Sequence, residues 1–195
     1  MIPTFYLFFT STKLECMLSE EKLIKGCIAG ERIAQKQLYE QYSPAFFALC
    51  LRYMPTRTEA EDVMIMGFTT IFEKISTFKN EGSFEGWMKK VIIHTAISTI
   101  RANKMQYLPE SDEKILDSMG VATSQNVTYS TICVKDIMHQ IRQLPDGCRS
   151  VFNLYAIEGY SYEEAANILN INVGTVRSQL ARARKILQKT LKEYI

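Results

Sequence analysis

The side chains best suited to acid–base chemistry are two pairs of adjacent carboxylates, Glu61-Asp62 and Glu163-Glu164. Two carboxylates can act as acid and base when their surroundings push their pKa values apart. Both pairs, however, fall in the first turn of an expected helix, where capping and the helix dipole account for acidic side chains. No glycine-rich phosphate loop and no Ser/His/Asp or Cys/His grouping accompanies them in the sequence. The sequence therefore predicts no catalytic residues and a protein that is not an enzyme.

The cysteines show no pattern typical of a metal site. Cys16, Cys27, Cys50, Cys133 and Cys148 include no C-x-x-C pair, and no histidine stands at ligand spacing from them. Structural zinc sites depend on such spacing, so neither a metal nor another cofactor is predicted. An odd number of cysteines fits reduced thiols in a cytoplasmic protein better than a secreted disulfide framework.

Positive charge is concentrated near the C-terminal end of the chain. Between Val173 and Lys192 there is no acidic residue, and apolar residues recur along one stripe of a helix, at Val176, Leu180, Ala183 and Leu187. The opposite face carries Arg177, Arg182, Lys185, Lys189 and Lys192. A helix with this pattern can pack on a domain through one face and meet a polyanion with the other.

The composition indicates an ordinary globular protein. The chain has 195 residues, of which 47% are hydrophobic and 23% charged, enough for one domain or two small ones. The first ten residues are apolar but too short to cross a bilayer, so no membrane insertion is expected. Met17 followed by Leu-Ser-Glu-Glu resembles a natural protein start. Residues 1–16 are therefore expected to be an N-terminal extension that contributes little to the fold.

Residues 17–104 are predicted to form a first helical domain. We expect a helix from Ser19 to about Gly30, a second from near Glu31, and a new one starting at Pro44. A capping box formed by Thr58 and Glu61 is expected to open the next helix. The final helix of this part is expected over 84–102, after a polar loop at 78–83.

Residues 105–133 are polar, locally acidic and without period, which predicts a linker. Residues 134–195 return to helical patterning. A second capping box, Ser161 with Glu164, is expected to open a short helix, and Asn172 to cap the basic helix after a turn. No segment alternates as a strand does, so the fold class predicted is all-α: two small helical domains joined by a flexible linker.

A short capped helix, a turn and a longer helix form the pattern of a helix-turn-helix, whose second helix enters the major groove of DNA. The residues expected to face the groove are Thr175, Arg177, Ser178, Ala181 and Arg182, with Lys185 on the same basic face. Arginine can bond guanine, serine several bases, and an alanine methyl group a thymine methyl group. The alternative is a bundle helix whose basic face is only solvated.

Two sets of residues resemble one known family. The first set is Leu144-Pro145, Arg149-Ser-Val-Phe152, Glu158-Gly-Tyr-Ser-Tyr-Glu-Glu164, Gly174-Thr-Val-Arg-Ser178 and Leu180-Ala-Arg-Ala-Arg184. The second is Leu38-Tyr39, Tyr42, Ala60-Glu-Asp-Val63, Phe68, Phe72, Gly82-Ser-Phe84 and Trp87. The first set resembles the C-terminal domain of bacterial sigma factors. The second set resembles their N-terminal domain. The extracytoplasmic-function (ECF) group matches best, and the resemblance covers nearly all of residues 18–195.

This resemblance implies an alternative sigma factor that binds core RNA polymerase and promoter DNA, and such factors often have an anti-sigma partner. The helix after Glu61 is similar to the surface that docks on the polymerase, through Asp62, Ile65, Met66 and Thr69. The following loop and helix resemble the part that captures the minus-10 element, with Lys79, Asn80, Ser83, Lys89, Lys90 and His94 as the expected contacts. The helix-turn-helix resembles the domain that binds the minus-35 element.

The chain departs from the family's usual pattern at the docking and melting surfaces. Ile65-Met66 stands where a Gln-Glu pair is usual, and His94 where asparagine is usual. Docking would then depend more on apolar packing. Two rival functions remain: a helix-turn-helix regulator that binds duplex DNA without polymerase, and a helical interaction protein that binds no DNA.

Overall fold

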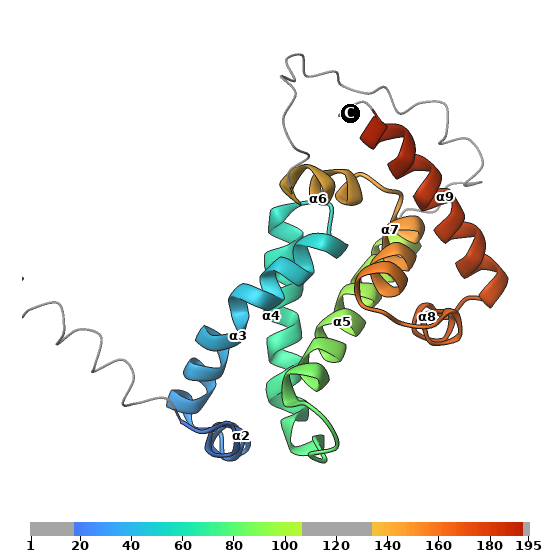
Figure 1. Ribbon diagram of the computed structural model, residues 1–195. Helices are drawn as coiled ribbons and strands as arrows, with labels where there is room; N and C mark the ends of the chain where they lie inside the picture. The colour runs from blue at the N-terminus through green and yellow to red at the C-terminus, as the bar shows by residue number, and fades with distance from the viewer. Residues whose placement is uncertain (1–17, 107–133, 193–195) are drawn as a thin grey trace, which may run out of the picture.

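The computed structural model describes residues 18–106 and 134–192, which form helices joined by short turns (Figure 1). The N-terminal domain comprises α2 (Glu20–Ile28), α3 (Arg32–Tyr53), α4 (Arg57–Lys74), the 3-10 helix η1 (Ile75–Thr77) and α5 (Phe84–Gln106). The C-terminal domain comprises α6 (Val134–Arg142), α7 (Asp146–Phe152), the π-helix η2 (Asn153–Ile157), α8 (Tyr162–Leu169) and α9 (Val173–Lys192). The predicted all-α fold with two helical domains is confirmed. The expected extension and residues 107–133 of the expected linker lie outside the described residues.

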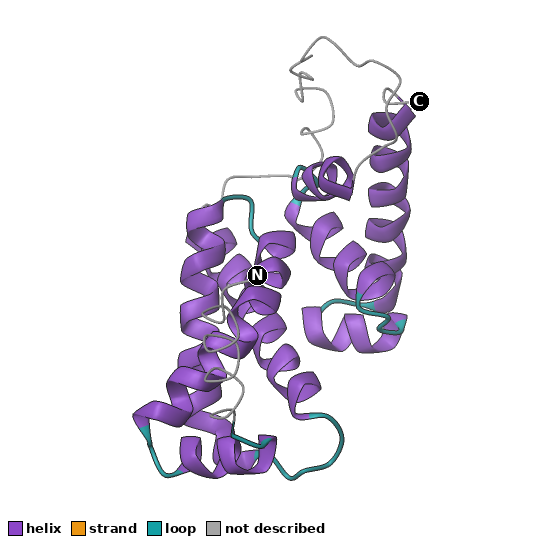
Figure 2. Ribbon diagram, turned by 60° about the vertical axis from the view of Figure 1, so that its left-hand side comes forward, coloured by secondary structure: helices purple, strands orange, loops and turns teal. Residues whose placement is uncertain are grey.

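The N-terminal domain is a bundle of three long helices. Figures 1 and 2 show α3, α4 and α5 packed along one another, with α2 across one end of the bundle. Its core is made of fully buried apolar side chains, including Leu38, Phe68 and Ile92. Helix α4 approaches α5 closely at Gly67, where an added Cβ would lie 2.4 Å from the Cδ1 atom of Ile92. The absence of a side chain at this one position therefore sets the spacing between two helices that carry predicted binding residues.

Helix α3 continues through Pro44, so the predicted start of a new helix at that residue is wrong. Proline inside a helix removes one backbone hydrogen bond and crowds the preceding turn, at a cost of about 3 kcal/mol. Pro44 is exposed, whereas residues on both sides of it, among them Leu38, Tyr42 and Phe46, are buried. Burying each such side chain contributes about 1.5–3 kcal/mol, and together they hold the two halves in one helix.

The capping box of α4 lies two residues earlier than predicted. The Thr56 hydroxyl accepts a bond from the Glu59 amide at 3.2 Å, and the Glu59 carboxylate accepts one from the Thr56 amide at 3.1 Å. Thr58 and Glu61 have the same spacing, but the chain leaves Pro55 in extended geometry at Thr56, and the helix begins there. Glu61 instead accepts a hydrogen bond from Arg57 at 2.8 Å, one helical turn away.

The helix-turn-helix has the predicted caps. The Ser161 hydroxyl accepts from the Glu164 amide at 3.2 Å, and the Glu164 carboxylate accepts from the Ser161 amide at 2.8 Å. Asn170 ends α8 in the left-handed region with φ of 50°. The Asn172 side chain then accepts from the Thr175 amide at 2.7 Å. These local bonds fix the angle at which α9 leaves the turn.

The two domains contact each other at the C-terminal end of α3. The last carbonyls of a helix lack partners within the helix, and here residues of α7 and η2 bond two of them. Arg149 Nε donates to the Tyr53 carbonyl at 2.8 Å, and Asn153 Nδ2 donates to the Arg52 carbonyl at 2.7 Å. Val151 and Leu154 join the apolar core of the N-terminal domain. The domains are therefore packed together, with one continuous core.

Candidate polymerase and promoter interfaces

The residues of α9 that are predicted to contact DNA differ in their exposure to solvent. Arg177, Ser178, Ala181 and Lys185 are exposed, whereas Thr175 and Arg182 are half-buried. The Thr175 hydroxyl donates to the Asn172 side chain at 3.0 Å and so belongs partly to the cap. Arg182 has a buried Nε for which the described residues provide no hydrogen-bond partner. The first turns of α9 thus present exposed hydrogen-bond donors, whereas the Arg182 side chain is partly enclosed by the protein.

An aromatic pair that was not predicted from the sequence holds two arginines of α9. Tyr155 and Tyr162 stack with ring centroids 4.5 Å apart. The Arg177 guanidinium lies 5.4 Å from the Tyr162 ring centroid, and that of Arg184 lies 5.8 Å from the Tyr155 ring centroid. A cation over an aromatic face gains about 0.5–1 kcal/mol at an exposed site. Tyr162 therefore restricts the orientations of Arg177, a residue predicted to contact bases.

The predicted minus-10 loop lies between η1 and α5 and is exposed at Lys79, Asn80 and Ser83. Asn80 and Gly82 both have positive φ, 55° and 89°, which gives the loop its tight path. The Ser83 hydroxyl accepts from the Gly86 amide at 3.2 Å and so caps α5, yet it keeps a proton to donate.

Aromatic packing anchors both ends of this loop. The rings of Phe78, Phe84 and Trp87 lie with centroids 5.1 to 5.9 Å apart. Phe84 is fully buried, and Trp87 is half-buried and stacks on it. Trp87 therefore has a packing role, and the polar residues of the loop project from a rigid base.

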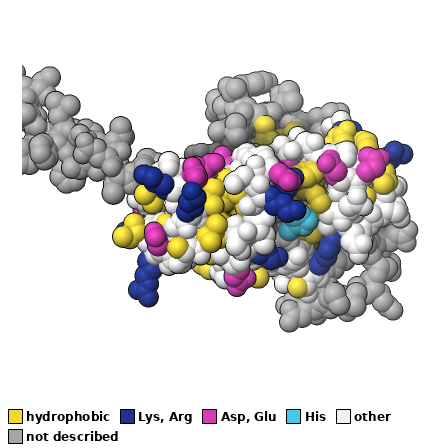
Figure 3. Space-filling model, turned by 90° about the horizontal axis from the view of Figure 1, so that it is seen from below, with side chains coloured by type: hydrophobic (Ala, Val, Ile, Leu, Met, Phe, Trp, Pro, Cys, Tyr) yellow, Lys and Arg dark blue, Asp and Glu magenta, His cyan; other side chains and the backbone are white. Residues whose placement is uncertain are grey.

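Cationic residues of α4 and α5 lie near His94. Burial lowers the pKa of His94, and the nearby charges of Arg101, Lys74 and Lys90 lower the pKa further. The imidazole is therefore neutral at pH 7 and can both donate and accept a hydrogen bond. Figure 3, which views the molecule from below, shows a histidine with lysine and arginine side chains beside it. Lys90 is exposed, but Lys89 pairs with Glu158 of the C-terminal domain.

The predicted docking residues Asp62, Ile65, Met66 and Thr69 are all exposed and follow one stripe of α4. Ile65 is 56% exposed and Met66 52% exposed, which is high for large apolar side chains. Thr69 donates its hydroxyl proton to the Ile65 carbonyl at 3.0 Å, so its methyl group also adds to the apolar character of the stripe. The stripe offers a partner two bulky apolar side chains with one acid beside them.

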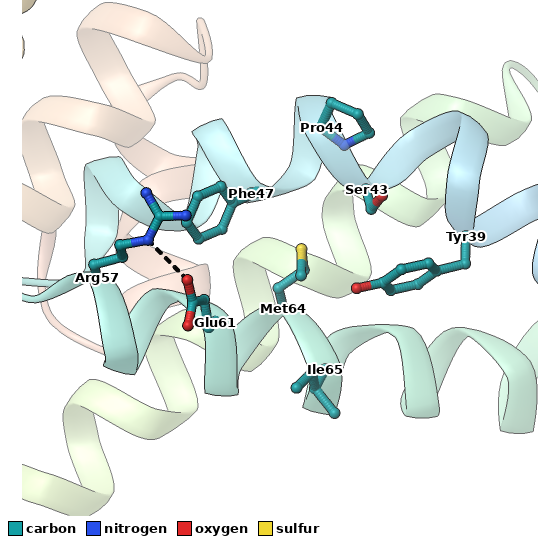
Figure 4. Close-up of a pocket in the computed structure, with 8 residues that line it drawn as sticks. All are labelled: Tyr39, Ser43, Pro44, Phe47, Arg57, Glu61, Met64 and Ile65. Carbon is teal, nitrogen blue, oxygen red and sulfur yellow. Dashed lines mark hydrogen bonds and ion pairs between the residues drawn. The ribbon is translucent and has the colours of Figure 1, made fainter.

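A groove between α3 and α4 adjoins this stripe and was not predicted from the sequence. It has a volume of 410 Å³, and Figure 4 shows its walls. Tyr39 lies at one end, Met64 lies near the middle, and Ile65 belongs to both the groove and the stripe. At the other end the Arg57 guanidinium lies 5.0 Å from the Phe47 ring centroid. The apolar surface available to a docking partner therefore extends from α4 to α3.

The described residues contain no group of histidine, cysteine or acidic side chains that could hold a metal ion. The three described cysteines are buried, and burial raises the pKa of Cys27 to about 11 and that of Cys50 to about 12. Both thiols are therefore protonated at pH 7, the unreactive form. Within the described ranges, every helix is too short or too polar to cross a membrane.

Comparison with known proteins finds a family match in each of the two domains. The family model for sigma-70 region 2 matches residues 38–105, and the model for sigma-70 region 4 matches residues 135–187. The two matches together span more than half of the chain, and they coincide with the α3–α5 bundle and with the helix-turn-helix domain. The chain belongs to the sigma-70 family of RNA polymerase sigma factors, in its extracytoplasmic-function group.

Similar proteins include the ECF RNA polymerase sigma-E factor of Haemophilus influenzae, which is 25% identical over 89% of this chain and 96% of that protein. The ECF sigma factor SigW of Bacillus subtilis is 27% identical over 89% of this chain and 97% of that protein. Among solved structures, the sigma factor RpoE of Bartonella quintana, in complex with the anti-sigma factor NepR, has a similar fold. The TM-score is 0.53 at 23% identity, covering 80% of this chain and 96% of that one.

The protein is therefore an alternative sigma factor, a transcription initiation factor that binds core RNA polymerase and directs promoter recognition. A regulator that binds duplex DNA without polymerase is not favoured, because it leaves the region 2 match unexplained.

Proposed function

We propose that three surfaces divide this work between them. The α4 stripe and the adjoining groove dock on core RNA polymerase, the loop at 79–83 and α5 hold the minus-10 strand, and α9 binds the minus-35 element. The observation that carries the proposal is the exposed apolar stripe on α4, since Ile65 and Met66 have more than half of their surface in solvent. A regulator that binds only DNA has no use for such a stripe.

Docking on the polymerase combines apolar contact with charge. Ile65 and Met66 pack against the partner, Asp62 sets the orientation, and Thr69 completes the edge of the contact. Methionine is flexible and polarizable, so it can fill an irregular surface. The Gln-Glu pair that is usual in the family would bind through hydrogen bonds. Ile65 and Met66 cannot form such bonds with their side chains, so this chain requires a less polar partner surface.

The minus-10 surface holds an unpaired strand through polar groups and charge. Asn80 and Ser83 present an amide and a hydroxyl that can bond an extruded base. Lys79 and Lys90 supply positive charge for the backbone, and neutral His94 adds one donor and one acceptor. Binding the unpaired strand better than the duplex favours the melted promoter, so the factor acts through binding free energy and catalyses no reaction.

The minus-35 surface combines base contacts with phosphate contacts. Arg177, Ser178 and Ala181 lie near the N-terminal end of α9, where a helix-turn-helix meets base edges. Thr175 and Arg182 flank them, and Lys185 reaches the phosphate backbone. We further place the protein in the cytoplasm, where core polymerase acts. An anti-sigma protein is a candidate partner, since the RpoE relative was solved with one.

The decisive test is transcription in vitro with core RNA polymerase on a library of random promoter sequences. We expect transcripts that start downstream of a two-part motif, with minus-35 and minus-10 elements at fixed spacing, and none from core polymerase alone. Binding of the protein to duplex DNA together with promoter-independent transcription would instead support the plain regulator. The same full-length protein serves for both measurements.

Replacing Arg182 by alanine should weaken binding to the preferred minus-35 sequence by about 1–3 kcal/mol, with much less effect on unrelated duplexes. The arginine bonds a base edge only in the preferred sequence. Fluorescence anisotropy with both duplexes at one fixed salt concentration measures the difference. Lys189→Ala is the matched control, because a phosphate contact weakens binding to all sequences equally. An equal loss on both duplexes would show that Arg182 contacts phosphate instead.

A further inference from the structure

One acidic side chain of the C-terminal domain is buried between two cations of the N-terminal domain. Glu158 follows η2, and its side chain is only 1% exposed. One carboxylate oxygen accepts a hydrogen bond from Arg52 at the end of α3, and the other pairs with Lys89 of α5. Gly159, with φ of 78°, turns the chain directly after the acid. A carboxylate in this position links α3, α5 and the helix-turn-helix domain.

Other groups of the C-terminal domain also meet the cations of α5. Arg101 donates to the Ile168 carbonyl, near the end of α8, at 2.7 Å. The Ser161 bonds lower the pKa of Glu164, and the charge of Lys90 lowers it further, which places this acid near Lys90. Part of the α5 surface assigned above to the minus-10 strand therefore faces oxygen atoms of the other domain.

The chemistry of this contact matches that of a DNA backbone. A carboxylate and a phosphodiester each present two anionic oxygens, and arginine and lysine bind either of them through charge-assisted hydrogen bonds. Arg52 and Lys89 converge on one carboxylate from two different helices, so the same two donors can converge on one phosphate. While Glu158 occupies this position, a DNA strand cannot use it.

We propose that Glu158 is an intramolecular competitor of promoter DNA: its carboxylate occupies a two-cation phosphate site formed by Arg52 and Lys89. The proposal rests on the proposed function, because it takes α5 as part of the minus-10 surface, and it adds Arg52 to that surface. The packed arrangement of the two domains is then a self-inhibited state. Promoter binding requires the C-terminal domain to move away from α5.

The docking stripe remains available in this packed state. Ile65 and Met66 keep more than half of their surface in solvent while Glu158 is in place. Core polymerase can therefore bind before the domains separate, and DNA affinity rises only afterwards. This order limits binding of the free factor to DNA without polymerase.

Glu158→Gln tests the proposal, with Glu163→Gln as the matched control. Both substitutions remove one negative charge from the C-terminal domain, but Glu163 is an exposed residue in the first turn of α8. The probe is a fluorescent 15-nucleotide single strand of random sequence, measured by anisotropy without polymerase. We expect Glu158→Gln to bind about tenfold more tightly than the control. Its slope of log affinity against log salt concentration should be steeper by about 0.7, as for one added phosphate contact on a single strand.

Two further measurements separate the parts of the proposal. Small-angle X-ray scattering should give a larger radius of gyration for Glu158→Gln than for Glu163→Gln. Lys89→Gln should also expand the protein but without a gain in DNA affinity, because it removes part of the phosphate site. A gain in affinity with Lys89→Gln as large as with Glu158→Gln would overturn the phosphate site.

Equal DNA affinity of Glu158→Gln and Glu163→Gln would overturn the proposal as a whole. If Glu158→Gln fails to fold, Glu158→Asp against Glu163→Asp makes the same comparison, with a gain of about threefold expected and equal affinity again overturning it. Failure of the proposed function has a different result: the unsubstituted protein would then give no promoter-specific transcripts with core polymerase. Transcription that starts normally while the two glutamine variants bind DNA equally rejects the competitor alone.

Discussion

Replacing Ile65 and Met66 together by lysine should weaken binding to core RNA polymerase by about 100-fold or more. Each side chain is more than half exposed in the free protein and loses that exposure on docking. Losing two apolar contacts removes about 1–2 kcal/mol each, and an unpaired lysine in an apolar contact adds a desolvation cost. Titration of labelled protein with core polymerase measures the change.

The chain offers a matched control for this pair. Ile33 near the start of α3 is 72% exposed and lies outside the α4 stripe, so Ile33→Lys makes the same kind of change elsewhere on the domain. We expect its affinity for the polymerase to stay within about threefold of the original, a difference of about 0.7 kcal/mol. Affinity of the double-lysine variant within the same threefold range would exclude the stripe as the docking surface.

A second substitution at the same positions asks which partner surface the stripe requires. Ile65→Gln with Met66→Glu restores the pair usual in the family without adding bulk. If docking depends on polar contacts, this variant binds at least as well as the original. Weaker binding indicates that the partner surface is apolar at this contact, in agreement with the groove lined by Tyr39 and Met64.

Local patterns in the sequence were sufficient to predict most of the helices and the helix-turn-helix. Ser161, Glu164 and Asn172 act over three or four positions, so their bonds could be predicted without knowledge of the rest of the fold. The same locality explains the errors in the N-terminal domain. Thr56 and Thr58 each begin a motif of the right spacing, and only the path of the chain after Pro55 decides between them.

Contacts between distant residues could not be predicted in this way. Arg52 and Glu158 are 106 positions apart, and Arg149 and Tyr53 are 96 positions apart, so no helical period connects them. The sequence does hold one weak signal for Arg149: it stands between the apolar residues Cys148 and Val151, which are both buried. A charged residue at a buried position needs several hydrogen-bond partners, and this one joins the two domains.

Arg149→Met should destabilise the folded protein by about 3–5 kcal/mol and loosen the contact between the domains. The side chain is 3% exposed, and its guanidinium bonds three backbone carbonyl oxygens. It donates to the carbonyls of Tyr53 at 2.8 Å, Leu144 at 2.9 Å and Arg142 at 3.0 Å. Methionine fills a similar volume without any donor, so these carbonyls lose a charge-assisted bond each.

Thermal unfolding followed by circular dichroism measures this effect. A loss of 3 kcal/mol lowers the unfolding midpoint by about 6–12 °C when the two packed domains unfold together. Lys189→Met is the matched control, because it also removes one positive charge from the C-terminal domain but at an exposed residue. It should leave the midpoint within about 2 °C. Arg149→Lys should fall between the two, because an ammonium group keeps the charge but cannot reach all three carbonyls as the planar guanidinium does. Equal midpoints for Arg149→Met and Lys189→Met would mean that the buried guanidinium contributes no net stability, and the packed arrangement of the domains would then depend on apolar contact alone.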